Sequence, residues 1–255
     1  MFSACGLLPE KKVVDGTQSP NNLYAEAKSE LNSGNYAAAV KLFEALEANY
    51  PYGQFAQQAQ LEIAYAYYKD QENASAIAAT DRFIQLYPQH RNVDYAYYIK
   101  GLANFNDSPG ILGYITTKLI NQDMSERDAK ASRESFENLK QLVTRFPNSK
   151  YTPDALKRMA FLVNTLATGE IHVAQYYMKR KAYVAAARRA QFILQEYPQT
   201  PATEEALYIM ARAYSELGLT DLRDDAEKIM RKNFPESSYL SDSAPLGERR
   251  WWRIW

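Results

Sequence analysis

Cysteine and histidine are nearly absent from this chain of 255 residues, which holds one cysteine and two histidines. Because Cys5 has no second cysteine to pair with, a framework of intrachain disulfides is excluded. His90 and His172 lie far apart in the sequence, and neither has a cysteine or a carboxylate at the spacing of a metal site. We therefore expect no metal centre, and a structural or surface role for both histidines.

Catalytic and nucleotide-binding motifs are missing as well. The sequence contains no GxSxG, HExxH, GxGxxG or GxxxxGK followed by Ser or Thr. Adjacent carboxylates such as Glu204 and Glu205, or Asp224 and Asp225, diverge by about 100° on a helix, so they do not converge on one substrate. We expect neither enzymatic activity nor a bound cofactor.

Net charge and long apolar runs are also lacking. Lys plus Arg and Asp plus Glu each number 30. This balance argues against general nucleic-acid binding, which depends on a basic field. No apolar run approaches the ~20 residues of a membrane-spanning helix. Alternating β-branched runs long enough for strands do not occur, so we predict an all-α fold.

The chain does contain a repeated helix–turn–helix pattern. Small residues recur at intervals of 37 residues or about twice that, and each unit closes with an aromatic residue followed by proline. The small residues are Ala27, Ala64, Gly101, Ala174 and Ala211, and the closing pairs are Tyr50-Pro51, Tyr87-Pro88, Phe146-Pro147, Tyr197-Pro198 and Phe234-Pro235. This signature is typical of the tetratricopeptide (TPR) repeat, whose helices bury their apolar faces only in a stack.

The pattern predicts a TPR superhelix of five repeats within residues 20–235. The repeats cover about 20–51, 55–88, 91–147, 152–198 and 201–235. The third repeat has an insertion at 106–124, whose apolar residues either pack on the stack or meet a partner. After it, Ser125 and Asp128 resemble a capping box that starts a helix. A single long helix from Thr152, bent or broken near Gly169, accounts for the added length of the fourth repeat.

Both ends of the chain lack helical periodicity. Residues 1–19 have the composition of a flexible tether. Residues 236–255 form a tail in which Trp251, Trp252 and Trp255 alternate with arginines. The tail is either a flexible end or a peptide that docks on a membrane surface or in an acidic groove.

The first helices of TPR repeats usually line a concave binding face. In that register the first three repeats form an aromatic trough with lysines at one end. The predicted lining is Tyr24, Lys28, Tyr65, Tyr68, Lys69, Tyr95, Tyr98 and Phe105, with Leu31, Leu61, Leu102 and Asn106. Such a trough suits an extended peptide with aromatic side chains and a carboxylate, since tyrosine buries area at low entropy cost. Alternatively, these tyrosines pack between neighbouring helices.

A separate basic cluster occurs in the fourth repeat. It consists of Lys179, Arg180, Lys181, Arg188 and Arg189. Basic side chains gathered in this way either meet an acidic partner domain or form a plain solvated face.

The start of the chain, Phe2-Ser3-Ala4-Cys5-Gly6, resembles a bacterial lipobox. In a lipobox, small residues precede a cysteine that is cleaved free and lipidated. Gly6 rather than an aspartate follows Cys5, which by analogy with bacterial sorting favours the outer membrane. The pattern therefore predicts lipidation at Cys5.

Longer stretches make the chain similar to the BamD (ComL) family, TPR lipoproteins of the outer-membrane β-barrel assembly (BAM) machinery. The resemblance covers about residues 2–235. The stretches that carry it are LYAEAKSELNSGNY, IAYAYYKD, DRFIQLYP, DYAYYIKGL, RFPNSKYTPDALKRM and VAQYYMKRKAYVAAARRA.

This resemblance implies an outer-membrane lipoprotein on the periplasmic side, anchored by lipid on Cys5. The protein would scaffold BamA, the barrel-forming subunit, beside other BAM lipoproteins. In the family the C-terminal repeats dock on the membrane-proximal POTRA domain of BamA, through positions matched here by Arg188 or Arg189. The N-terminal repeats are implicated in binding the C-terminal segments of unfolded outer-membrane proteins, which end in an aromatic residue and a carboxylate.

A second interpretation belongs to a different class. The stretch FPNSKYTPDAL also resembles repeats of periplasmic TPR adaptors that act in cell-envelope division or in peptidoglycan machinery. The proteins that co-purify with the chain discriminate between the two interpretations.

Overall fold

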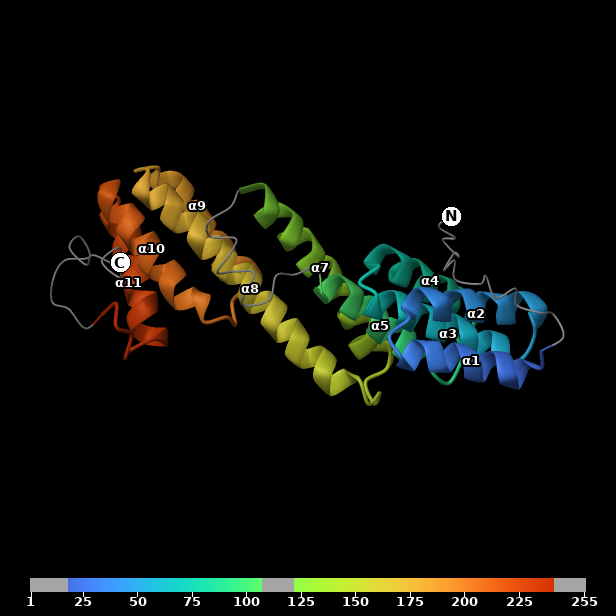
Figure 1. The fold of residues 1–255 in the computed structure, drawn as a ribbon. Coiled ribbons are helices and arrows are strands. Elements are labelled where there is room, and N and C mark those ends of the chain that lie inside the picture. Colours follow the sequence, from blue (N-terminus) through green and yellow to red (C-terminus); the bar gives the residue numbers. More distant parts are fainter. Residues whose placement is uncertain (1–17, 107–121, 241–255) are drawn as a thin grey trace, which may run out of the picture. The chain divides into compact units, whose positions relative to one another are not determined.

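Helices make up all the regular structure in the residues that the structure describes, 18–106 and 122–240 (Figure 1). The structure is a computed structural model of the chain. It divides into two compact units, Met1–Leu156 and Lys157–Trp255. The predicted all-α class with TPR-type hairpins is confirmed, whereas the number of repeats stays a prediction. Cys5, most of the insertion and most of the tail lie outside the described residues.

In the first unit each helix packs on the next. The helices, blue to green in Figure 1, are α1 (Pro20–Asn32), α2 (Tyr36–Asn49), α3 (Gln54–Lys69), α4 (Asn73–Leu86), α5 (Val93–Asn106) and α7 (Gln122–Arg145). The last of these begins before Ser125, where we predicted its start. That boundary was wrong because residues typical of a helix start are also tolerated inside the first turn.

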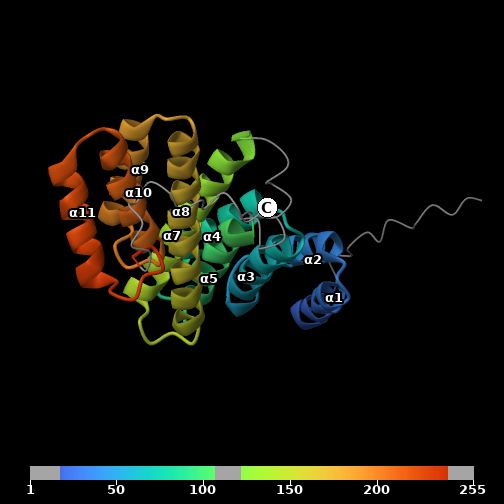
Figure 2. The ribbon, with the colours of Figure 1, turned by 90° about the vertical axis from the view of Figure 1, so that its left-hand side faces the viewer.

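The second unit begins within α8 (Thr152–Lys179), because the first residues of this helix, up to Leu156, belong to the first unit. The later helices are α9 (Tyr183–Glu196), α10 (Ala202–Glu216) and α11 (Thr220–Asn233), which lie side by side in Figure 2. The predicted long helix is confirmed, and α8 is not interrupted at Gly169. A Cβ added there would meet nothing within 4 Å, so packing does not require glycine at this position.

Every small residue of the repeat signature is buried. Ala27, Ala64, Ala174 and Ala211 are each 0% exposed, and Gly101 is also buried. Gly101 lies where α5 meets α7, and a Cβ added to it would stand 2.3 Å from Leu139 Cδ2. Small side chains at these positions therefore let neighbouring helices approach closely.

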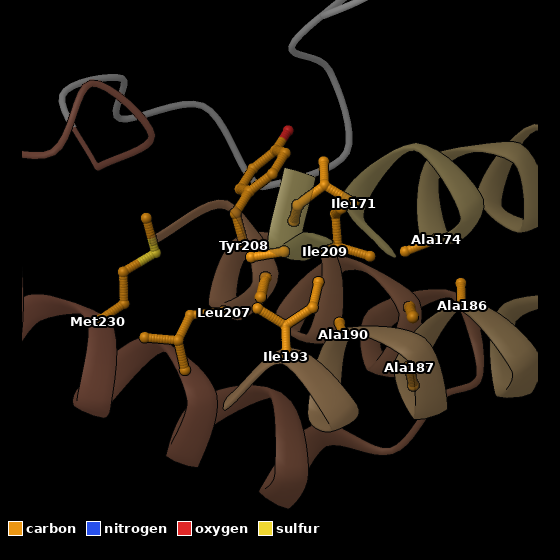
Figure 3. Packing of buried hydrophobic residues seen from close by; sticks show 13 residues of the cluster. Ile171, Ala174, Ala186, Ala187, Ala190, Ile193, Leu207, Tyr208, Ile209 and Met230 are labelled. Carbon is orange, nitrogen blue, oxygen red and sulfur yellow. The ribbon is translucent and has the colours of Figure 1, made fainter. Parts of the chain in front are cut away.

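The core of the second unit also includes small residues at the contact between two helices. In Figure 3, Ala174 of α8 faces Ala186 of α9, while larger aliphatic side chains fill the space toward α10 and α11. Ile193, Leu207 and Met230 are among these buried side chains. The alternation of small and large residues holds the helices at close spacing.

Four hairpins turn in the same way. One residue takes a left-handed conformation, and the next backbone N–H donates to a carbonyl five residues earlier, as in a Schellman motif. The left-handed residues are Gly34, Gln71, Lys181 and Gly218. Two hairpins thus place a side chain where glycine is the least strained choice.

His90 has the structural role that the sequence predicts. Its ring packs edge-on against Phe83 with centroids 5.2 Å apart, and its Nδ1 accepts a hydrogen bond from the Asn92 N–H at 3.1 Å. Burial lowers the pKa of His90, and the nearby charge of Arg91 lowers it further. The side chain therefore serves the turn between α4 and α5.

Replacing Gly101 with alanine should destabilise the first unit by about 1–3 kcal/mol, because fully buried Leu139 must move to admit the new methyl group. The control is Gly169→Ala, which enters open space inside a helix and should stabilise by about 0.4–1 kcal/mol. Urea unfolding followed by circular dichroism measures both. A Gly101→Ala variant as stable as the parent protein would contradict the close contact.

Candidate functional site

The N-terminal end of the predicted trough is held by a carboxylate from the neighbouring helix. Glu62 of α3 receives hydrogen bonds from two side chains of α1, the Tyr24 hydroxyl to Oε1 and Lys28 Nζ to Oε2, each at 3.1 Å. Gln58 Nε2 donates to the same Oε1 at 3.2 Å. Only 13% of the Glu62 side chain is exposed, so this pair is partly shielded from water.

Burial, followed by the charge of Glu62, raises the pKa of Tyr24 well above its usual value. Tyr24 therefore stays a hydrogen-bond donor at all physiological pH values. Lys28 already has a partner in Glu62, so it offers little charge to an incoming carboxylate. Tyr24 and Lys28 lie side by side as the register predicts, and their polar groups are engaged within the protein.

Aromatic surface continues along α3 toward α5. The ring of Tyr65 lies 6.4 Å from that of Tyr68 and 6.5 Å from that of Tyr95. Burial raises the pKa of Tyr95, and the neighbouring tyrosines raise it further. At the end of α3, Lys69 is exposed and has no hydrogen bond or ion pair with the described residues. Of the predicted trough, this part combines half-buried aromatic rings with an unpaired cation.

Farther along, the rings of Tyr95 and Tyr98 are covered by Tyr151 from the linker between α7 and α8. Tyr151 stacks on Tyr98 with centroids 4.7 Å apart and on Tyr95 at 5.1 Å. The Tyr98 hydroxyl donates to Asp154 Oδ2 at 2.6 Å. Tyr95 and Tyr98 therefore fit the alternative interpretation of the trough, in which the tyrosines pack between neighbouring elements.

The structure also corrects part of the predicted lining. Leu31, Leu61 and Leu102 are 2–7% exposed and belong to the core. These three leucines do not line a groove, because they face neighbouring helices and pack in the core. Phe105 is half-buried near the end of α5, and the side chain of Asn106 lies outside the described set.

Two residues that complete this surface were missed. Glu62 precedes Tyr65 by three residues, so helical spacing could have placed it on the same face. Tyr151 ends the segment Phe146–Tyr151, FPNSKY, whose pattern recurs at Phe234–Tyr239, FPESSY. That recurrence was the available signal that the last tyrosine has a packing role.

The predicted docking arginines line an open hollow of about 290 Å³ in the second unit. Arg188 and Arg189 stand beside Tyr177, Ala185 and Phe192. Arg189 Nη1 donates to Glu170 Oε2 at 3.0 Å, with the arginine side chain 45% exposed. Arg188 is exposed and has no hydrogen bond or ion pair with the described residues, so it carries the uncompensated charge of the hollow.

A second aromatic cluster lies where the chain leaves α11. Tyr239 stacks on Tyr208 of α10 with centroids 4.5 Å apart and hydrogen-bonds Glu205. Gln175 of α8 also donates to Glu205. Burial raises the pKa of Glu205, while hydrogen bonds from Gln175 and Tyr239 oppose that rise.

No group of histidine, cysteine and acidic residues able to hold a metal ion occurs within 18–106 and 122–240. Over the same residues, none of the helices combines the length and apolar character of a membrane span.

The chain as a whole is similar to a family of known proteins. Residues 17–229 match the family model described as outer membrane lipoprotein. The outer membrane protein assembly factor BamD of Neisseria meningitidis serogroup A is 47% identical over 257 residues, covering 100% of this chain and 95% of that protein. The BamD of Xylella fastidiosa Temecula1 is 39% identical, covering 90% of this chain and 77% of that one.

More distant proteins are also similar. The BamD of Vibrio cholerae is 36% identical, with coverage of 84% and 87%. A TPR protein of Thermus thermophilus is similar in structure, with 15% identity, coverage of 86% and 93%, and a TM-score of 0.37, which adds nothing to the assignment.

Replacing Glu205 with glutamine should stabilise the protein at pH 7. A carboxyl whose pKa is raised by folding costs stability once it ionises, and this cost disappears as the pH falls toward the ordinary value of 4.5. The gain should therefore shrink between pH 7 and pH 4. Thermal unfolding across this range measures it, with Glu204→Gln as the neighbouring control. A gain that persists at pH 4 would disprove the burial effect.

Proposed function

Because this chain belongs to the outer membrane lipoprotein family that includes the BamD proteins, we propose that it is a non-catalytic subunit of the machinery that assembles β-barrel proteins in the outer membrane. The observation that carries this proposal is the 47% identity to a BamD protein along the whole chain. TPR-type hairpins suit the role, since such stacks present extended surfaces to other polypeptides.

The first unit receives the unfolded substrate in this proposal. Tyr65 and Tyr68 offer half-buried rings that a peptide can cover, and Lys69 supplies a cation with no partner among the described residues. A C-terminal segment with an aromatic residue and a free carboxylate has the complementary groups. Lys28 is already paired with Glu62 and therefore offers a carboxylate less uncompensated charge than Lys69 does.

The second unit docks on the membrane-proximal POTRA domain of BamA. Arg188 attracts an acidic side chain of the partner, and the rings of Tyr177 and Phe192 provide apolar area beside it. Arg189 has one guanidinium nitrogen bound by Glu170, which leaves its other donors for the partner. A lipid on Cys5 would keep the protein at the periplasmic face of the outer membrane.

An adaptor of envelope division or peptidoglycan machinery is the competing function. Affinity purification from envelope extracts separates the two. Recovery of BamA and other BAM lipoproteins supports the proposal, whereas recovery of division or wall-synthesis proteins without BamA overturns it.

Replacing Lys69 with glutamine should weaken binding of a peptide that ends in phenylalanine and a free carboxylate by up to about fivefold, the range of an exposed ion pair. The amidated form of the peptide should bind parent and variant alike. Fluorescence anisotropy gives both affinities, and Lys41→Gln on the exposed face of α2 is the control. Equal loss for the two peptide forms would remove Lys69 from the carboxylate contact.

Replacing Arg189 with glutamate should weaken BamA binding about tenfold or more, because a carboxylate would then face Glu170 at the rim of the hollow. Arg188→Ala should reduce the association rate and its dependence on salt. Surface plasmon resonance with the purified POTRA domain measures both. Arg231→Glu is the matched control, since Arg231 also pairs with one glutamate but does not line the hollow. BamA affinity unchanged by Arg189→Glu would exclude docking at this site.

A further inference from the structure

The last described residues repeat a turn that occurs earlier in the chain. Phe234–Tyr239 reads FPESSY and Phe146–Tyr151 reads FPNSKY. In both segments the serine N–H donates to the phenylalanine carbonyl at 3.0 Å, and the serine hydroxyl accepts from the tyrosine N–H at 3.2 Å. The two segments therefore present their final tyrosines in the same way.

Each of these tyrosines stacks on a tyrosine of an earlier helix. Tyr151 lies 4.7 Å from Tyr98 with 18° between the rings, and Tyr239 lies 4.5 Å from Tyr208 with 20° between them. Tyr98 and Tyr208 both stand three residues before the small residue of their repeat. The cluster in the second unit is thus a copy of the one in the first.

The two tyrosine clusters differ in the hydrogen bonding of one hydroxyl group. The Tyr98 hydroxyl donates to Asp154, whereas the Tyr208 hydroxyl is buried and has no hydrogen-bond partner among the described residues. In Figure 3 this hydroxyl points away from the aliphatic side chains of the cluster. A buried hydroxyl without a hydrogen-bond partner costs free energy. With Tyr239 in the site, the Tyr208 hydroxyl therefore stays unsatisfied.

The walls of the site come from two helices of the second unit. Gln175 and Met178 of α8 and Glu205 and Arg212 of α10 surround the stacked rings, leaving a cavity of only about 10 Å³. Gln175 follows the small residue of its repeat by one position, as Lys28 and Tyr65 do in the first unit. Tyr239 therefore packs beside a position equivalent to two residues of the predicted peptide trough.

We propose that Glu205, Tyr208, Gln175 and Met178 form a binding slot for a tyrosine side chain of an extended peptide, and that Tyr239 is its resident, exchangeable ligand. Tyr208 provides the stacking face. Glu205 accepts a hydrogen bond from a phenol, as it does from Tyr239. A backbone carbonyl next to the incoming tyrosine would satisfy the Tyr208 hydroxyl, which gives an external peptide a contact that the resident lacks.

The charge of the slot separates it from the surface around Lys69. The slot is lined by both an acidic and a basic side chain, Glu205 and Arg212, whereas Lys69 is a single exposed cation, so the slot is not built around a terminal carboxylate. The slot goes beyond the assembly role proposed above, and its occupancy is measured without BamA or any barrel protein. Failure of one proposal therefore leaves the other intact.

Tyr239→Ala in the full chain should open the slot. The probe is the peptide Phe-Pro-Glu-Ser-Ser-Tyr with acetylated and amidated ends, titrated by isothermal calorimetry. We expect the variant to bind it at least about tenfold more tightly than the parent protein, a gain of about 1.4 kcal/mol. Adding Tyr208→Ala should abolish the gain, and a peptide with alanine in place of tyrosine should not bind.

A second variant, Tyr239→Phe, tests the slot with less risk of unfolding the protein, because it keeps the stacked ring and removes only the hydroxyl contact to Glu205. It should bind the probe with an affinity between those of the parent protein and Tyr239→Ala. The control is Tyr52→Ala, which removes a tyrosine that is 92% exposed and should leave probe binding unchanged. If circular dichroism shows folded variants and neither change at Tyr239 strengthens binding, Tyr239 is a fixed structural residue and the slot does not exist.

Discussion

Close approach of neighbouring helices at one small residue per hairpin is the contact on which the rest of the structure depends. Ala64 and Ala211 are fully buried, and Gly101 leaves no room even for a methyl group beside Leu139. Three residues before the small residue stand Tyr24, Tyr98 and Tyr208, and Tyr65 follows Ala64 by one position. The spacing of the tyrosines in both units is therefore a consequence of helix packing.

Ion pairs within the protein neutralise some of the basic side chains that were predicted to contact a partner. Glu62 engages Lys28, and Glu170 engages Arg189, so two of the predicted contact residues are already compensated. Lys69 and Arg188 are not compensated within the described residues. Each unit thus combines aromatic rings with an available cation, the combination that suits extended polypeptides in the first unit and an acidic protein surface in the second.

Much of the fold could be predicted because its signals are local. The positions of Ala27 and Ala174 were found by spacing alone, and both are buried as expected. The start of α7 was misplaced because a capping pattern does not mark one residue uniquely.

The site was harder to predict because its residues are brought together by elements distant in sequence. Tyr151 covers Tyr95 and Tyr98 from a linker more than fifty residues away, and no helical period links them. Likewise, the hydrogen bonds to Glu62 join two different helices. Aromatic residues could be placed on the correct face, but their availability depends on these tertiary contacts.

The recurrence of one linker at two places has a consequence for engineering. Phe146–Tyr151 leads directly into α8, and its serine carbonyl accepts the N–H of Thr152 as the helix begins. After Phe234–Tyr239, Leu240 makes the equivalent bond to Ser237. The backbone at Leu240 is therefore already oriented as at a helix start, and a further hairpin could be grafted there to lengthen the array by one modular unit.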